Sequence, residues 1–256
     1  MVHSIARGAQ TSGRVVYSGW FYAWFVFLLA VCRLVLVVTP SGRPSAGVLL
    51  FFVRLFLHLV GIRVEAQGLE HLEREPLVLV SNHASYVDPL ALIGALPQHV
   101  LFVAKKETMG MPLLGGIMRK VGHLFVDRYS VAQSVTDVEC VKQALGRGSS
   151  VLVSAEGTFT RARGLRPFRL GAFKAAAETA CPVVPVAILG SRHVLPDETW
   201  LLRRAPMRVI VRPLILPAGR DWLEIVRLRD AAFAEVLAAC GEPRLDITDA
   251  AIPGRP

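Results

Sequence analysis

The chain has 256 residues, a formal net charge of +9 at pH 7 and a hydrophobic content of 53%. This length suits one large domain or two small ones, and the mean hydropathy of +0.46 is too high for an ordinary water-soluble enzyme. A basic, apolar protein is suited to an anionic membrane surface or an anionic substrate. Nucleic acid is disfavoured as a partner because the chain has no Lys/Arg block with interleaved aromatic residues.

The excess of apolar residues lies near the N-terminus. Residues 1–14 are polar and predict a loose tail, whereas residues 15–38 are mostly apolar and long enough to span a bilayer. A break at residues 39–44 precedes a second apolar segment, residues 48–60, which carries Arg54 and His58. For residues 1–60 we therefore predict a tail and a helical pair that dips into or lies on one leaflet, at the cytoplasmic face of the cell membrane. A single span is the alternative.

Residues 61–240 have the pattern of a layered α/β domain. Apolar and β-branched runs predict strands at residues 62–66, 76–81, 100–104, 123–126, 151–155, 183–189 and 207–216. Helices are predicted at residues 89–96, 112–120, 131–146, 171–179 and 222–239. Strands that alternate with helices are typical of layered α/β folds. The polar segment 241–256 predicts a loose C-terminal tail.

Polar residues directly follow the buried strand at residues 76–81. His83 comes at the end of that strand, and Asp88 comes just before a helix that begins with proline. Open α/β sheets bind their ligands at the carboxyl ends of the strands. A carboxylate that accepts the Nδ1 proton of a histidine leaves Nε2 free to take a proton, so His83 and Asp88 are predicted as a general base and its orienting partner. Ser85 lies close by, but the G-x-S-x-G elbow of a Ser-His-Asp hydrolase is absent.

Three more segments follow in order, with the sequences GHLFVDR at residues 122–128, EGT at 156–158 and VVPVAI at 183–188. Together with NHASYVD at residues 82–88, they resemble the N-H-x4-D, G-x-x-F-x-x-R, E-G-T-R and V-P-V blocks of the glycerolipid acyltransferase family. The best known members of that family are the 1-acylglycerol-3-phosphate acyltransferases. The resemblance covers about residues 62–220 and implies a layered mixed sheet flanked by helices, preceded by the apolar helical pair.

The resemblance also implies an acceptor site. A phosphate needs guanidinium or ammonium groups, and Arg128 is the best candidate, with Lys105 and Arg161 next. The third block is implied to help bind the acceptor through Glu156, Gly157 and Thr158. Phe159 departs from the family, because it stands where the family usually has the arginine of E-G-T-R. Arg161 is our candidate for the missing charge.

The activity implied is transfer of a fatty acyl group from acyl-CoA or acyl-carrier protein to the free hydroxyl of lysophosphatidate, giving phosphatidate. The alcohol only needs its proton removed, so neither an acyl-enzyme nor a cofactor is expected. No metal is expected either, because no His/Cys/Asp cluster has metal-ligand spacing. The expected partners are membrane lipids and the two substrates. The alternatives are an acyltransferase for another lysolipid, such as a lysophospholipid, an ornithine lipid or a glycolipid, and a catalytically silent membrane lipid-binding protein.

Overall fold

The computed structural model describes residues 2–74, 76–97, 100–127, 131–160 and 162–245. A seven-stranded sheet with the order β1-β7-β6-β2-β5-β3-β4 lies at its centre. The strands are β1 Val64–Gln67, β2 Val78–Ser81, β3 Leu101–Lys105, β4 Leu124–Val126, β5 Val151–Ser154, β6 Val183–Leu189 and β7 Met207–Val211. Strands β2 to β6 are parallel, β7 is antiparallel to β6, and β1 is parallel to β7. The predicted mixed sheet is therefore confirmed.

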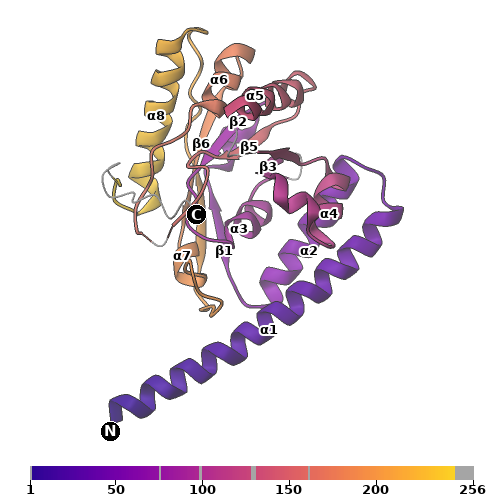
Figure 1. The fold of residues 1–256 in the computed structure, drawn as a ribbon, viewed down its shortest axis with the longest axis vertical. Coiled ribbons are helices and arrows are strands. Elements are labelled where there is room, and N and C mark those ends of the chain that lie inside the picture. The colour runs from indigo at the N-terminus through magenta and orange to yellow at the C-terminus, as the bar shows by residue number, and fades with distance from the viewer. Residues whose placement is uncertain (1, 75, 98–99, 128–130, 161, 246–256) are drawn as a thin grey trace.

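Helices cover both faces of the sheet (Figure 1). They are α1 Val2–Val38, α2 Arg43–Leu59, α3 Asp88–Ala95, α4 Leu114–Val121, α5 Val131–Gly146, α6 Gly171–Thr179, α7 Ser191–Val194 and α8 Trp222–Cys240, with 3-10 helices η1 Leu69–Leu72 and η2 Lys106–Gly110. The central strand β2 is buried along its whole length, with Leu79 in the core under α2 and α3 and Val80 in the core under α6 and α8. A run of consecutive apolar residues is what a strand covered on both faces requires.

The register of the parallel strands brings their carboxyl ends to one edge of the sheet. Ser81 is paired with Ser154 of β5, and the N–H of Ala155 donates to the carbonyl of Ser81 at 3.0 Å. At the same level, Lys105 of β3 is paired with Val126 of β4. We call this side of the sheet the carboxyl edge. Of the predicted chemical segments, the first and third follow β2 and β5 at this edge, whereas the second contains β4 and the fourth lies within β6.

The N-terminal region consists of the long helix α1 and the much shorter helix α2, and not of two similar helices. Among the described residues, only Ser12–Val38 of α1 is long and apolar enough to cross a membrane. The shorter α2 buries Leu49, Val53 and Phe56 between α1 and the α/β domain. Residues 2–14, predicted to be a loose tail, continue α1 as helix. Once α1 is nucleated by packing, each added residue gains a hydrogen bond, so the helix extends through polar sequence.

Other element boundaries differ from the prediction for local reasons. The strand predicted at residues 207–216 ends at Val211, because Pro213 has no N–H to donate to a ladder. The chain pairs again at an isolated bridge between Ile215 and Val183. The short helices η1, η2 and α7 were not predicted, since one or two turns carry no measurable hydrophobic period. Residues at the start of the predicted C-terminal tail are fixed, because Glu242 forms an ion pair with Arg192 at 2.7 Å, while residues 246–256 lie outside the described chain.

Candidate active site

The predicted pair of His83 and Asp88 is assembled within one loop at the carboxyl edge. Asp88 Oδ2 accepts from His83 Nδ1 at 2.8 Å and from the backbone N–H groups of Ala84 at 2.7 Å and Ser85 at 2.9 Å. Asp88 is 1% exposed and is the first residue of α3, where the positive end of the helix dipole also favours a carboxylate. This arrangement holds the proton of the imidazole on Nδ1 and leaves Nε2 as the basic nitrogen.

Two buried side chains hold the backbone of this loop in place. Asn82 binds the backbone of Ile188 in β6 twice, donating from Nδ2 to the carbonyl at 3.0 Å and accepting at Oδ1 from the N–H at 2.7 Å. Glu156, which follows β5, accepts the N–H of His83 at 2.6 Å through Oε1 and the N–H of Arg166 at 2.8 Å through Oε2. The base is therefore tied to both strands that flank β2. Neither clamp was predicted from the sequence, because the bonded residues lie far apart along the chain.

The carboxyl group of Glu156 is almost completely buried, and this burial raises its pKa to about 8, against the opposing effect of the N–H donors of Arg166 and His83. The resemblance to the acyltransferase family implies that Glu156 helps to bind the acceptor. In the structure its two oxygens bind backbone groups of the protein, so its evident role is to position the loop that carries His83. A contact with substrate stays a prediction.

The rest of the third block forms a tight turn beside the base. Gly157 has a φ of 77°, and a Cβ there would come within 2.5 Å of the side chain of Arg169, so the turn requires glycine. Thr158 follows, with its hydroxyl 3.4 Å from the carbonyl of Phe159. The ring of Phe159 then packs edge-to-face against His83, with 4.5 Å between the ring centroids, and against Tyr86 at 4.7 Å. An aromatic ring thus lies against the base at the position where the family usually has arginine.

The predicted phosphate-binding cations are described only in part. Lys105 is the last residue of β3, two strands from β2 and so roughly 10 Å from it across the sheet. A contact of Lys105 with substrate stays a prediction. Arg128 and Arg161 lie outside the described residues, so their roles stay predictions. His123, within the second block, is buried, which lowers its pKa to about 4, and its Nδ1 accepts the N–H of Phe102 at 3.1 Å.

The side chain of Ser85 has a structural role. Its hydroxyl is buried, donates to the carbonyl of Leu195 at 2.7 Å and lies 3.3 Å from the N–H of Val87. A nucleophilic serine would need to present its hydroxyl to the imidazole of His83. The Ser-His-Asp hydrolase that the sequence analysis disfavoured is therefore opposed by the geometry as well.

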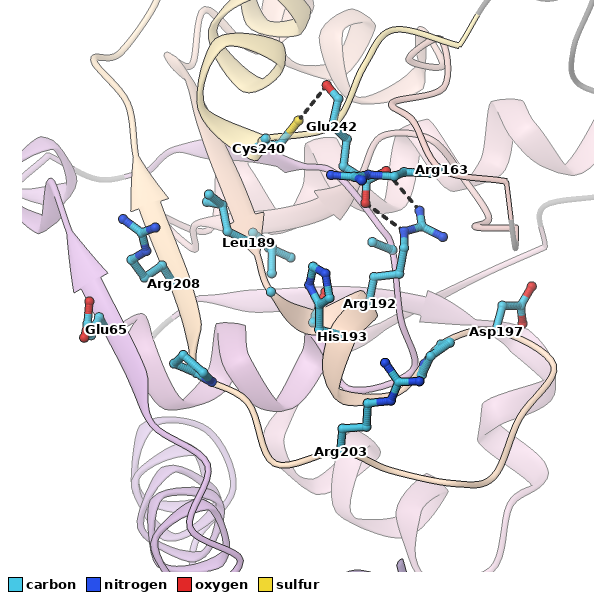
Figure 2. Close-up of a pocket in the computed structure, with 17 residues that line it drawn as sticks. Glu65, Arg163, Leu189, Arg192, His193, Asp197, Arg203, Arg208, Cys240 and Glu242 are labelled. Atoms are coloured by element: carbon cyan, nitrogen blue, oxygen red, sulfur yellow. Dashed lines mark hydrogen bonds and ion pairs between the residues drawn. The ribbon is translucent and has the colours of Figure 1, made fainter. Parts of the chain in front are cut away.

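Two cavities adjoin the loops of the carboxyl edge. The larger, with a volume of about 580 Å³, has Ala84, the residue after His83, in its lining, together with the end of β6 and the beginnings of β7 and β1 (Figure 2). The smaller, of about 390 Å³, lies between β3, β4, β5 and the helices α5, α6 and α8, and includes Gly157 in its lining. Neither cavity was predictable from the sequence, because each is lined by segments that meet only in the folded chain.

Comparison with known proteins places this site in a family. Residues 63–189 match the family model "Acyltransferase". The chain is 30% identical over 232 residues to the 1-acyl-sn-glycerol-3-phosphate acyltransferase alpha of Ovis aries, covering 90% of this chain and 79% of that protein. It is 31% identical over 216 residues to the chloroplastic 1-acyl-sn-glycerol-3-phosphate acyltransferase BAT2 of Brassica napus, covering 78% of this chain and 62% of the relative, which is less than two thirds of the relative's length.

A solved structure has the same fold. The crystal structure of the 1-acyl-sn-glycerophosphate (LPA) acyltransferase PlsC from Thermotoga maritima matches 89% of this chain and 98% of its own, with a TM-score of 0.71 at 18% identity. The identity with the sheep protein, the match to the family model and the ordered blocks around His83 agree with one another. The chain belongs to the acyltransferase family.

Proposed function

We propose that the protein is an O-acyltransferase that moves a fatty acyl group from acyl-CoA or acyl-carrier protein to the free hydroxyl of lysophosphatidate, forming phosphatidate in phospholipid synthesis. The observation that carries this proposal is the pair of His83 and buried Asp88, joined at 2.8 Å at the carboxyl edge of the sheet. The names of the sheep and Brassica napus relatives support lysophosphatidate as the acceptor.

The chemistry follows from the tautomer that Asp88 imposes. Nε2 of His83 takes the proton of the acceptor hydroxyl as its oxygen attacks the thioester carbonyl. A C–O bond forms, the C–S bond breaks, and the imidazolium returns its proton to the departing thiolate. Asp88 stabilises the imidazolium between these two steps. No side chain of the protein is acylated in this mechanism, which agrees with the hydrogen bond that the Ser85 hydroxyl donates to the carbonyl of Leu195.

The acceptor phosphate is assigned to the side of the base where β3 and β4 end. Lys105 lies at the end of β3, and Arg128 follows β4 by two residues in the sequence. Both belong to segments that resemble the family's acceptor blocks. The contact of Phe159 with His83 favours a second candidate, a lysolipid acceptor without a terminal phosphate, because this apolar ring stands where a cation would be expected.

We also propose that α1 lies in the membrane interface rather than crossing the bilayer. The helix contacts the rest of the protein between Arg14 and Leu36: Arg14 donates to the carbonyl of Leu201 at 2.8 Å, Tyr22 donates to that of Trp200 at 3.1 Å, and Leu36 is buried in the core. A helix held on the domain over this length cannot also be surrounded by lipid. Its outer side exposes apolar residues, namely Val16, Trp20, Val26, Phe27, Leu34, Val37 and Val38. This arrangement brings the site to the leaflet that contains its lipid substrate, for which we propose the cytoplasmic face.

The test is transfer by the purified full-length protein on lipid vesicles, with labelled acyl-CoA or acyl-carrier protein and a panel of acceptors. Lysophosphatidate should be the preferred acceptor, and Arg128→Ala should raise its apparent KM about ten- to a hundred-fold, the value of a lost charge-assisted hydrogen bond. Arg147→Ala, which removes an exposed arginine at the opposite edge of the sheet, is the matched control. Preference for a lysolipid without a terminal phosphate would favour the second candidate, and transfer to none of the acceptors would refute the proposal.

A further inference from the structure

The imidazole of His83 faces two competing nucleophiles. It can take a proton from the hydroxyl of a lipid or from water, and water is present in large excess at the edge of the sheet. When water attacks the thioester carbonyl, a C–O bond forms, the C–S bond breaks, and the imidazolium returns its proton to the departing thiolate. The products are then a free fatty acid and a thiol. A transferase that relies on a general base therefore needs a means of keeping water from that base.

Three rings lead from the base to the solvent. The ring of Phe159 packs edge-to-face against the imidazole of His83 at 4.5 Å and against the ring of Tyr86 at 4.7 Å, measured between centroids. The side chain of His83 is 15% exposed, whereas Tyr86 is 65% exposed, so Phe159 lies between the base and an outer aromatic residue. Phe159 thus covers one side of the base with a surface that offers water no hydrogen bond, and Tyr86 covers Phe159 in turn.

The backbone holds Phe159 in place from both directions. Before it in the chain, Glu156 accepts the N–H of His83 at 2.6 Å. After it, the carbonyl of Thr160 accepts from Nη1 of Arg192 at 2.8 Å, and the guanidinium of Arg192 is itself held by an ion pair. The ring is therefore positioned against the base by the protein and does not depend on substrate for its place.

We propose that Phe159, supported by Tyr86, is a specificity-determining residue that excludes water from His83, so that the acyl group is transferred to a lipid hydroxyl and not to water. The inference rests on the proposed function and deepens it by naming what selects the nucleophile. A lipid acceptor brings apolar groups that can pack against the ring, whereas water loses hydrogen bonds there. A guanidinium at this position, as the family usually has, would instead offer water up to five donors beside the base.

The first experiment measures hydrolysis without acceptor, as release of labelled fatty acid from acyl-CoA or acyl-carrier protein by the full-length protein on lipid vesicles. In the wild type, water that enters from this side must displace the ring. Phe159→Ala should therefore raise the rate about two- to tenfold, the factor that one aromatic contact contributes. Phe159→Tyr keeps the ring and should hydrolyse the donor at the wild-type rate.

Two exposed positions supply a second variant and its control. Tyr86→Ala should also raise hydrolysis, by less than Phe159→Ala because Tyr86 contacts the base only through Phe159. Its exposed position makes it the test of the same contact where Phe159→Ala does not fold, which thermal unfolding reports. Trp222→Ala removes a similarly exposed aromatic residue, 63% exposed at the start of α8, and should leave the rate unchanged. Adding His83→Ala to Phe159→Ala should abolish the extra hydrolysis.

The second experiment adds the panel of acceptors and measures the ratio of free fatty acid to acylated lipid. This ratio should rise in Phe159→Ala and stay at the wild-type value in Phe159→Tyr, whereas a merely damaged site would lower both products together. An unchanged ratio and hydrolysis rate in the folded variants would overturn the inference and leave the proposed function intact. An equal rise in Phe159→Tyr, or extra hydrolysis that persists without His83, would do the same. Transfer by the wild type to none of the acceptors would refute the proposed function, while the hydrolysis rates would still decide the inference.

Discussion

Asp88→Asn tests whether the carboxylate acts through its charge or through its hydrogen bonds. Three donors converge on Asp88 Oδ2, whereas Oδ1 is buried and has no partner among the described residues. In the asparagine variant, these donors select the side-chain orientation that places the carbonyl oxygen at the Oδ2 position and the NH2 group at the Oδ1 position. His83 should then keep its proton on Nδ1, and the loop should keep its shape.

The expected loss is the difference between a charged and a neutral acceptor for the imidazolium of His83. Hydrogen bonds to charged groups contribute about 1.5–3 kcal/mol, so kcat should fall about ten- to a hundred-fold. His83→Ala, which removes the base, should lose more, about 10²–10⁴-fold. The unpartnered NH2 group should cost about 1–3 kcal/mol of stability, too little to unfold a typical domain.

The assay is the initial rate of acyl transfer at saturating concentrations of both substrates, together with thermal unfolding of each variant. A folded Asp88→Asn protein with wild-type turnover would show that the charge has no role in catalysis. A folded Asp88→Asn protein as inactive as His83→Ala would show that the amide inverts and imposes the wrong tautomer. Near-normal turnover by a folded His83→Ala protein would remove the general-base mechanism altogether.

Three further predictions follow from individual contacts. Ser85→Ala should keep turnover within about tenfold of the wild type, because the hydroxyl donates a hydrogen bond to the carbonyl of Leu195 and takes no part in the reaction. Trapping of an acyl-enzyme at Ser85 would contradict this prediction. Burial raises the pKa of Glu156 from 4.5 to about 8. Between pH 4.5 and pH 8, the Glu156 carboxyl therefore keeps its proton in the folded state and has lost it in the unfolded state. The contribution of Glu156 to the free energy of unfolding falls as the pH rises through this range. The melting temperature of the wild type should therefore fall relative to that of Glu156→Gln from about pH 4.5 to 8, and a constant difference would oppose the shifted pKa. Replacing exposed Leu34 and Val38 of α1 by serine should weaken sedimentation with anionic vesicles without lowering the melting temperature, and unchanged sedimentation would place the membrane contact elsewhere.

The parts of the site that are local in sequence were predictable. His83 and Asp88 belong to one loop of a few residues between a strand and a helix, so their pairing needs no knowledge of the sheet order. All seven strands were predicted for a similar reason, since β1 has a local apolar–polar alternation and the other six are short, mainly apolar runs bounded by polar residues or turns. The long helix α1 was also predicted, although its extension through residues 2–14 was not, because that extension depends on a packed helix downstream.

The parts that depend on strand order were not predictable. Asn82 binds Ile188 because β6 lies next to β2, and Glu156 binds the N–H of His83 because β5 lies on the other side of β2. The same adjacency brings Phe159 against His83. A sequence shows that such residues follow strands but not which strands are neighbours, and each of these contacts joins segments more than 70 positions apart.

The reversal of direction in the sheet brings the beginnings of two strands to the edge where the parallel strands end. Strands β5, β3 and β4 end at the carboxyl edge on one side of β2, and β6 ends there on the other side. Beyond β6 the direction reverses, so Arg208 is near the beginning of β7 and Glu65 near the beginning of β1. Residues that begin these reversed strands thus face the same edge as residues that end the parallel ones. The loop that carries His83 at the end of β2 therefore has Lys105 on one side and the arginine-lined cavity on the other.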